Sequence, residues 1–278
     1  MDLTDLATIN QLLTRYRIWP TKEKGQNFLI DQEVLDKIIA AADLDSEDLV
    51  LEIGPGLGVL TQELVKRAKN VLAVELDRQL VKVLENNLKD CQNLQILAGD
   101  ILKIKNSDLA QDLGQPYKVV ANLPYNITAQ ILRKFLSYTP KPQQMVLMVQ
   151  KEVAERVTAL PGQLSLVALA VQLYGQPEIV SVVSRQSFYP EPAVDSAILK
   201  ISQIDQIWQF TPQIEKRFWQ LAKIGFASRR KQLQNNLVAG LKLSSAEVKN
   251  GLVKAKLDPL IRAQDLGVGD WLKLSTIF

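Results

Sequence analysis

Apolar and polar residues alternate along this chain in two distinct patterns. Short apolar runs predict buried strands, and apolar residues three or four positions apart predict helices. The expected strands are residues 49–53, 71–74, 94–97, 117–121, 145–149, 179–183 and 194–201, and the expected helices are residues 34–39, 60–68, 80–88, 127–135 and 152–159. Asp31 is the expected N-cap of the first of these helices, and residues 164–174 fit either element. Such alternation indicates an α/β fold with a parallel, doubly wound sheet.

The pattern also divides the chain into three expected parts. They are a leader with one weakly helical stretch, a large α/β domain and a small C-terminal helical domain, at residues 1–20, 21–204 and 205–278. In the last part a helical pattern leads into three consecutive cations, Arg229, Arg230 and Lys231. We expect these three side chains to be displayed on a helix.

The distribution of charge supports this division. The chain carries a net charge of +3, but residues 205–278 hold 12 Lys and Arg against 6 Asp and Glu, and residues 1–204 hold 21 against 24. A basic appendage on a nearly neutral body is typical of a domain that binds a polyanion. A solvated helical face would give the same count, so the charge alone leaves both interpretations open.

Two residue types restrict the chemistry. The chain has no histidine and a single cysteine, Cys91, which excludes Ser-His-Asp and Cys-His catalysis and any intramolecular disulfide. We expect no metal. No apolar run is long enough to span a membrane, and residues 1–16 lack the features of a secretory signal. The expected location is the cytoplasm, or the stroma or matrix of an organelle.

A glycine-rich turn follows the first expected strand. The segment from Glu52 to Gly58 reads EIGPGLG, in which Gly54 and Gly56 let the backbone turn sharply and approach a ligand closely. A dinucleotide fingerprint would require glycine at position 59, which is Val59. The turn therefore favours a nucleotide-like ligand other than a nicotinamide dinucleotide, although a purely structural turn would read the same.

Acidic residues follow the next two expected strands. Glu75 ends the second strand, where a carboxylate can accept both ribose hydroxyls of a nucleoside. Asp100 follows the third strand and can accept the exocyclic amine of adenine, while the backbone N–H of Ile101 donates to a ring nitrogen. Ligands of parallel sheets bind at the carboxyl ends of the strands, so these residues predict a nucleoside site.

The most specific motif, Asn122-Leu123-Pro124-Tyr125, follows the fourth expected strand. The exocyclic amine of adenine is a poor nucleophile because its lone pair is delocalised into the ring. The Asn122 side-chain oxygen and a backbone carbonyl can accept its two hydrogens and direct the lone pair at a methyl group. Pro124 stiffens the turn, and Tyr125 can stack on an extruded base. The motif therefore predicts methylation of adenine N6.

Several blocks, in order, resemble one family. They are residues 25–29, 52–58, 99–100, 122–126, 150–156, 187–196, 229–231 and 235–237, together with Glu75. The chain resembles the ribosomal RNA adenine dimethyltransferases, specifically the enzymes of the small subunit. The resemblance implies a Rossmann-like methyltransferase sheet that binds S-adenosylmethionine. It also implies dimethylation of two adjacent adenosines in the 3′-terminal hairpin of small-subunit (16S) rRNA, and a role in small-subunit assembly.

The resemblance also assigns roles to residues. Gln26, Asn27, Leu29 and Gly54 would cover the methionine end of the cofactor, Glu75 would bind its ribose, and Asp100 its adenine. The full expected cofactor set is Gln26, Asn27, Leu29, Gly54, Gly56, Glu75, Leu76, Asp100, Ile101 and Asn122. Phe188 would flank the flipped adenine opposite Tyr125, and Arg229, Arg230 and Lys231 would bind RNA.

Three alternatives remain open from the sequence. The same chemistry could act on large-subunit rRNA, as in enzymes that confer antibiotic resistance. The fold could serve as an assembly or transcription factor without catalysis, and a nicotinamide enzyme is the third. The cations at 229–231 and the Asn-Asn-Leu at 235–237 favour the small-subunit branch. The expected partner is the pre-30S ribosomal particle. The protein is expected to be a monomer that does not bind a membrane.

Overall fold

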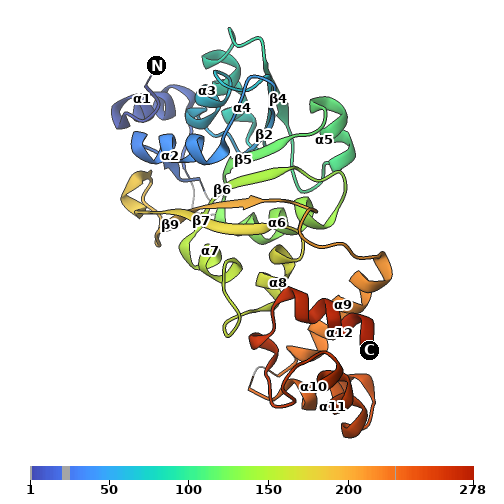
Figure 1. Cartoon of the computed structure of the whole chain (residues 1–278). Coiled ribbons are helices and arrows are strands. Elements are labelled where there is room, and N and C mark those ends of the chain that lie inside the picture. Colours follow the sequence, from blue (N-terminus) through green and yellow to red (C-terminus); the bar gives the residue numbers. More distant parts are fainter. Residues whose placement is uncertain (1, 21–25, 229) are drawn as a thin grey trace. The chain divides into compact units, whose positions relative to one another are not determined.

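The computed structural model of the chain describes residues 2–20, 26–228 and 230–278 (Figure 1). The chain divides into two compact units, each with its own internal contacts. The first unit comprises Met1–Ala154 and Gly175–Ile204, and the second comprises Glu155–Tyr174 and Asp205–Phe278. The second unit therefore begins with a segment that the sequence pattern grouped with the α/β domain.

Within the described residues, the first unit contains a seven-stranded sheet with the order β4-β3-β2-β5-β6-β9-β7. The strands are β2 (Leu49–Ile53), β3 (Asn70–Glu75), β4 (Leu94–Ala98), β5 (Lys118–Asn122), β6 (Gln144–Gln150), β7 (Gln176–Val183) and β9 (Ser196–Ser202). The first five run parallel, which confirms the α/β fold. The expectation of a parallel sheet is wrong for β9, which pairs antiparallel with both β6 and β7, so that β7 runs in the same direction as the first five strands.

Helices precede, connect and follow the parallel strands, and the last of them crosses from the first unit into the second. They are α2 (Gln32–Ala42), α3 (Val59–Leu64), α4 (Arg78–Asn87), α5 (Asn106–Leu113), the 3₁₀ turn η1 (Tyr125–Ile127), α6 (Thr128–Ser137) and α7 (Lys151–Val157). Asp31 caps α2 as expected, because its side chain accepts a hydrogen bond from the Val34 N–H at 3.2 Å. Helix α5 was not predicted, since its apolar stripe is short.

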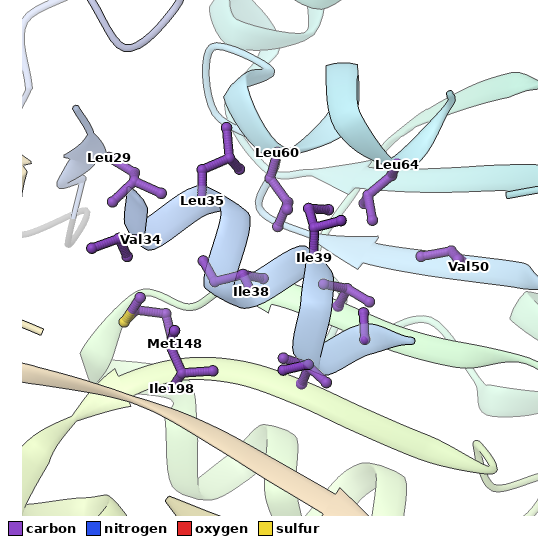
Figure 2. Close-up of a cluster of buried hydrophobic side chains, with 14 of the residues drawn as sticks. Leu29, Val34, Leu35, Ile38, Ile39, Val50, Leu60, Leu64, Met148 and Ile198 are labelled. Carbon is purple, nitrogen blue, oxygen red and sulfur yellow. The ribbon is translucent and has the colours of Figure 1, made fainter. Parts of the chain in front are cut away.

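One face of α2 forms the centre of a hydrophobic core. Leu35, Ile38 and Ile39 are buried and pack against apolar residues of α3 and of the sheet. Figure 2 shows these side chains between Leu60 and Leu64 on one side and Met148 and Ile198 on the other. This core fixes the layer of helices against the strands whose carboxyl ends carry the predicted motifs.

The expected leader is part of the first unit. Helix α1 (Leu6–Tyr16) begins at Asp5, whose carboxylate accepts a hydrogen bond from the Thr8 N–H at 2.8 Å. Its residues Ile9 and Leu13 are buried in a cluster with Phe28, Leu57, Leu80 and Val83. The segment therefore packs beside the glycine turn and helix α4.

A short ladder joins two distant motifs. Strand β1 (Phe28–Leu29) pairs antiparallel with β8 (Phe188–Tyr189), so that Leu29 lies opposite Phe188. The connection is strengthened where the Ser187 hydroxyl, in the 3₁₀ turn η2 (Arg185–Ser187), donates to the Asp31 carboxylate at 2.8 Å. Two-residue strands are too short for a periodic signal, so the sequence did not predict this pairing.

The second unit is helical, as the pattern predicted. Its elements are α8 (Leu166–Gln172), α9 (Pro212–Gly225), α10 (Leu233–Leu241), α11 (Ser245–Lys254), the 3₁₀ turn η3 (Ala263–Asp265) and α12 (Val268–Ile277). Its core contains Phe218, Leu237 and Trp271, all fully buried. Residues 155–174 belong to it because the Gly162 N–H donates to the Gln264 carbonyl at 2.9 Å and the Gln264 amide returns a bond to the Gly162 carbonyl.

The expected position of the basic cluster on a helix is wrong for its two described residues. Arg230 and Lys231 are exposed and lie in the turn between α9 and α10. The buried amide of Asn236 holds this turn, because its Nδ2 donates to the carbonyls of Gly225 and Ser228 at 2.6 and 3.1 Å. Arg229 lies outside the described residues.

Candidate active site

A cavity of about 440 Å³ lies in the first unit, bordered by the carboxyl ends of the parallel strands. Every residue expected to bind the cofactor lines it: Gln26, Asn27, Leu29, Gly54, Gly56, Glu75, Leu76, Asp100, Ile101 and Asn122. Pro124 lines it as well. The structure therefore brings together, from five separate segments of the chain, the residues that the sequence singled out. Their individual roles as ligands stay predictions.

The glycine turn forms one wall of the cavity. Gly54 and Gly56 have φ angles of +67° and +61°, a left-handed conformation that favours glycine. A Cβ atom on Gly56 would lie 3.4 Å from the ring of Phe28, so the turn packs directly against β1. The Gly54 N–H donates to the Val74 carbonyl at 3.0 Å and holds the turn on β3.

Glu75 lies at the end of β3 and is held by the backbone. Its Oε2 accepts the Gly56 N–H at 3.1 Å, and its Oε1 accepts the Asp77 N–H at 2.8 Å. Each carboxylate oxygen keeps a lone pair for a further donor, such as a ribose hydroxyl. Burial raises the pKa of Glu75 above its ordinary value, although the two backbone bonds oppose this shift.

Two acidic residues of the site were missed by the sequence reasoning. Glu52 lines the cavity and is 1% exposed, and burial raises its pKa to about 8, with the charge of Glu75 adding to the shift. Asp77 also lines the cavity, caps α4 through the Gln79 N–H at 2.9 Å, and accepts the Gln26 amide at 3.4 Å. A lone Glu within an otherwise apolar strand was the signal that could have identified Glu52.

The side of the cavity beyond β4 is formed by Asp100 and Ile101. The Gly99 N–H donates to the Glu75 carbonyl at 2.8 Å, and the Leu102 N–H donates to Asp100 Oδ1 at 3.0 Å. Leu76, an apolar side chain that is 70% exposed, lines the same cavity. A carboxylate next to an accessible apolar side chain suits the polar edge and the flat face of a purine.

Asn122 occupies the end of β5. Its Nδ2 donates to the Asn27 carbonyl at 3.2 Å, which ties the motif to the segment that precedes β1. Among the described residues no donor bonds to its Oδ1, so this oxygen remains available to accept a hydrogen bond from a ligand. The following residues are fixed by the Leu123 N–H, which donates to the Met148 carbonyl, and by a 3₁₀ turn closed from Ile127 to Pro124.

Three further residues of the predicted catalytic set do not line the cavity. Leu123 is buried, and Phe188 is 2% exposed within the core cluster that contains Leu29. The hydroxyl groups of Tyr125 and Ser196 lie 2.6 Å apart and share a hydrogen bond. Burial raises the pKa of the Tyr125 hydroxyl. Neither aromatic side chain therefore lines the cavity in this structure.

The chemistry of the lining fits a nucleoside that carries a positive charge. It offers carboxylates, an amide oxygen and glycine backbone, with apolar walls from Phe28, Leu57 and Leu60. Within the described residues, no group of three or more acidic or cysteine side chains is arranged to hold a metal ion. The same part of the chain contains no helix long and apolar enough to cross a membrane. This fold and this cavity define a Rossmann-like methyltransferase.

Comparison with known proteins assigns the chain within this class. The chain belongs to the ribosomal RNA adenine dimethylase family, whose sequence model matches residues 21–278. It is 46% identical over 275 residues to the ribosomal RNA small subunit methyltransferase A of Dehalococcoides mccartyi strain 195, covering 98% of this chain and 93% of the relative. The protein of that name in Streptococcus equi subsp. zooepidemicus is 40% identical over 289 residues, with coverages of 99% and 97%.

Solved structures agree with this assignment. The 23S rRNA methyltransferase ErmE superimposes with a TM-score of 0.76 at 27% identity and covers 90% of this chain and 99% of its own. A dimethyladenosine transferase from Plasmodium falciparum gives 0.71 at 30% identity, with coverages of 88% and 95%. The protein is therefore an enzyme that transfers methyl groups from S-adenosylmethionine to adenine in ribosomal RNA.

Proposed function

We propose that this enzyme dimethylates N6 of two adjacent adenosines in the 3′-terminal hairpin of small-subunit (16S) rRNA. The names of the relatives with 46% and 40% identity, which are small-subunit methyltransferases, support this choice of RNA. The substrate would be the pre-30S particle, met in the cytoplasm or in an organelle matrix by a monomer. Modification at that stage would give the enzyme a role in small-subunit biogenesis.

The cofactor would lie along the cavity with its groups matched to the lining. Glu75 would accept the ribose hydroxyls, because both of its oxygens are oriented by backbone N–H groups at the end of β3. Asp100 and the Ile101 N–H would bind the adenine edge, with Leu76 against its face. Gln26, Asn27, Leu29, Gly54 and Gly56 would enclose the methionine end. The cofactor supplies the electrophilic methyl group.

The observation that carries the proposal is the orientation of Asn122. Its amide nitrogen is bonded to the Asn27 carbonyl, which leaves Oδ1 as an acceptor at the end of β5. That oxygen, together with a backbone carbonyl of the turn, would accept the two hydrogens of the target amine and free its lone pair for the methyl group. An acceptor that is already fixed costs no reorganisation in the transition state.

The aromatic residues would form the pocket for the flipped base. Tyr125 is held by Ser196, and Phe188 lies in β8 opposite Leu29, so both are attached to rigid elements. We infer that the base stacks on Tyr125 and that Phe188, buried in β8, supports the opposite wall of the pocket from within the core, while Leu123 and Pro124 fix the turn that carries Tyr125. Stacking on aromatic rings is the usual way in which proteins hold an extruded base.

RNA binding is assigned to the second unit. Its Lys and Arg exceed its Asp and Glu, and Arg230 and Lys231 are exposed in the turn before α10. We infer that these two residues, with Arg229, bind phosphates. Changing Arg230 and Lys231 to Glu should weaken RNA binding and lower its salt slope by about 0.7 to 0.9 for each phosphate that the variant no longer neutralises. The matched control is the same change at Lys249 and Lys254, exposed on α11.

The test of the RNA surface is a set of binding isotherms at several salt concentrations. The proposal requires that the double variant at Arg230 and Lys231 binds more weakly and with a smaller salt slope, while the control variant keeps most of both. Equal reductions in the two variants would show that only the net charge of the unit matters. S-adenosylmethionine affinity should not change in either variant, because every residue that lines the cavity belongs to the first unit.

The large-subunit alternative is favoured by one observation, the superposition on ErmE, a 23S rRNA methyltransferase. Incubation with cofactor labelled in its methyl group and with either under-methylated 30S or 50S particles separates the two. The proposal predicts label in 30S RNA and none above background in 50S RNA. Label confined to 50S RNA would establish the alternative, and cofactor binding without transfer to either particle would favour a non-catalytic assembly factor.

A further inference from the structure

The charged residues that line the cavity are mainly acidic. Glu52, Glu75, Asp77 and Asp100 contribute carboxyl groups, and Arg78 is the basic residue among the lining residues that the structure describes. A cleft with such an excess of carboxyl groups concentrates positive charge. Three of these four acids, Glu75, Asp77 and Asp100, accept hydrogen bonds from backbone N–H groups. Glu52 differs from these three acids in its hydrogen bonding.

Glu52 is a carboxyl group enclosed by neutral surroundings. Its neighbours in register on the adjacent strands, Ala73 on β3 and Val120 on β5, carry no charge, and the polar group beside it on α3 is the Thr61 hydroxyl. The nearby charged group is Glu75, also on β3, which repels a second negative charge. Within the described chain its Oε2 is buried without a hydrogen-bond partner.

A carboxylate in such a place is strongly unfavourable, because burial removes its hydration and the Thr61 hydroxyl offsets only part of that loss. A buried group of this kind avoids the cost by remaining protonated. Burial accordingly raises the pKa of Glu52 to about 8, and the charge of Glu75 acts in the same direction. At pH 7 the free protein therefore holds Glu52 mainly as the neutral acid.

We propose that Glu52 responds to the charge of the cofactor: its carboxyl group is neutral in the free protein and ionises when the sulfonium of S-adenosylmethionine enters the cavity. The O–H bond breaks, the proton leaves to solvent, and the electron pair remains on the carboxylate, whose charge the sulfonium compensates. The inference rests on the proposed position of the cofactor in this cavity.

The reaction itself would reverse this ionisation. Methyl transfer converts the sulfonium into the uncharged thioether of S-adenosylhomocysteine, so the carboxylate loses its compensating charge and takes up a proton again. The spent cofactor is then no longer held by the charge pair that held the substrate form. Each target adenosine needs two methyl groups, so S-adenosylhomocysteine must be replaced by S-adenosylmethionine between the two transfers. Weaker retention of the uncharged product would favour this exchange.

Calorimetry on the wild-type protein tests the proposal directly. S-adenosylmethionine is titrated at pH 7 in phosphate and in Tris, whose different heats of ionisation reveal the number of protons released. We expect close to one proton per S-adenosylmethionine and close to none for S-adenosylhomocysteine, which has the same amino-acid and nucleoside groups. Because the acid is protonated when free and ionised when bound, affinity for S-adenosylmethionine should rise about tenfold per pH unit below the pKa of Glu52.

The variant Glu52→Gln keeps the shape of the neutral acid and removes its proton. It should release no proton, lose the pH dependence of S-adenosylmethionine affinity, and bind S-adenosylhomocysteine within about twofold of wild type, since neither state then ionises. Glu85→Gln, an exposed residue on α4, is the matched control and should behave as wild type. Thermal unfolding at pH 7 should be the same for wild type and Glu85→Gln, whereas Glu52→Gln should be more stable, because its folded state no longer has to hold a proton that the unfolded chain releases.

The outcomes separate this inference from the proposed function. If wild type binds S-adenosylmethionine without releasing a proton, or if Glu52→Gln releases as many as wild type, the inference is overturned and the methyltransferase assignment stands. If wild type releases a proton with both cofactor forms alike, the response is not to the sulfonium and the inference also fails. The comparison of the two cofactor forms needs only wild type, so it decides the matter even if the variant does not fold.

Discussion

Replacement of Asn122 by alanine removes the group on which the proposed chemistry depends. The side chain has two roles: Nδ2 donates to the Asn27 carbonyl at 3.2 Å, and Oδ1 is the acceptor proposed for the target amine. Alanine removes both Nδ2 and Oδ1, and the two losses affect different measured quantities. Loss of Oδ1 should change the rate of methyl transfer, and loss of the bond to Asn27 should change the affinity for the cofactor.

The two effects differ in size. Loss of one preorganised polar group at the reacting centre costs about 3 kcal/mol, roughly a hundredfold in rate. Loss of one hydrogen bond between neutral groups costs about 1 kcal/mol, roughly fivefold in affinity. Asn122→Asp keeps an acceptor but turns an oxygen toward the Asn27 carbonyl, so its cofactor affinity should fall further than that of the alanine variant, through repulsion.

Single-turnover methylation of under-methylated 30S particles at saturating cofactor measures the chemical step without the binding step. We expect the Asn122→Ala rate to fall at least about a hundredfold, with cofactor affinity by calorimetry reduced about fivefold. Gln130→Ala, an exposed change on α6, is the control and should be silent. A rate for Asn122→Ala within about threefold of wild type would remove this side chain from the mechanism and refute the reasoning.

Three further predictions concern other parts of the first unit. Glu75→Ala should weaken S-adenosylmethionine binding in calorimetry by about 1.5–3 kcal/mol for each ribose hydrogen bond removed, and unchanged affinity would exclude it as the ribose ligand. Tyr125→Ala should slow single-turnover methylation about 10- to 100-fold, because the base can no longer stack. Tyr125→Phe removes only the hydroxyl bonded to Ser196 and should keep a rate near that of wild type. Equal effects of the two variants would argue against stacking. Lys118→Met removes the cation whose Nζ lies 2.8 Å from the largely buried Asp48 carboxylate. Denaturant titration should show that the free energy of unfolding falls by about 3 kcal/mol, and a fall below about 1 kcal/mol would contradict this.

The parallel part of the fold was predictable because its signals are local. Each buried strand is a short apolar run, and each motif follows a strand directly, so the rule that ligands meet the carboxyl ends of parallel strands was enough to group Gly54, Glu75, Asp100 and Asn122. The segment around Gln26 was grouped with them only through the family resemblance. In the structure the bond from Asn122 to the Asn27 carbonyl explains why that segment is near.

Strand direction and unit membership were not predictable by the same means. The run that became β9 resembles those of the parallel strands, and a local pattern of apolar residues carries no information about strand direction. Residues 155–174 look like a continuation of the α/β pattern, yet the bonds between Gly162 and Gln264 assign them to the second unit. Such long-range hydrogen bonds leave no trace in a local pattern.

Some features of the candidate site were predictable from the sequence, and others depend on tertiary structure. The motif identified Tyr125 as a base-stacking candidate, and the family resemblance identified Phe188. Only the structure shows that Phe188 is enclosed by the core and that Tyr125 is bonded to Ser196. The helical expectation for Arg230 and Lys231 failed because Asn236, a buried amide, satisfies backbone carbonyls that a continued helix would have used itself. Burial of a polar side chain is a property of tertiary structure, and Glu52 was overlooked for the same reason.

The position of the methyl groups in the product identifies the reaction of this enzyme. Wild-type enzyme, S-adenosylmethionine and under-methylated 30S particles are incubated, the RNA is cut with a nuclease, and the fragments are sequenced by tandem mass spectrometry. We predict N6,N6-dimethyladenosine at two adjacent positions of the 3′-terminal hairpin, and at least about a hundredfold less of it at the same early time point with Asn122→Ala. Methylation at another site of the 30S RNA, or methyl groups on an atom other than N6, would contradict it.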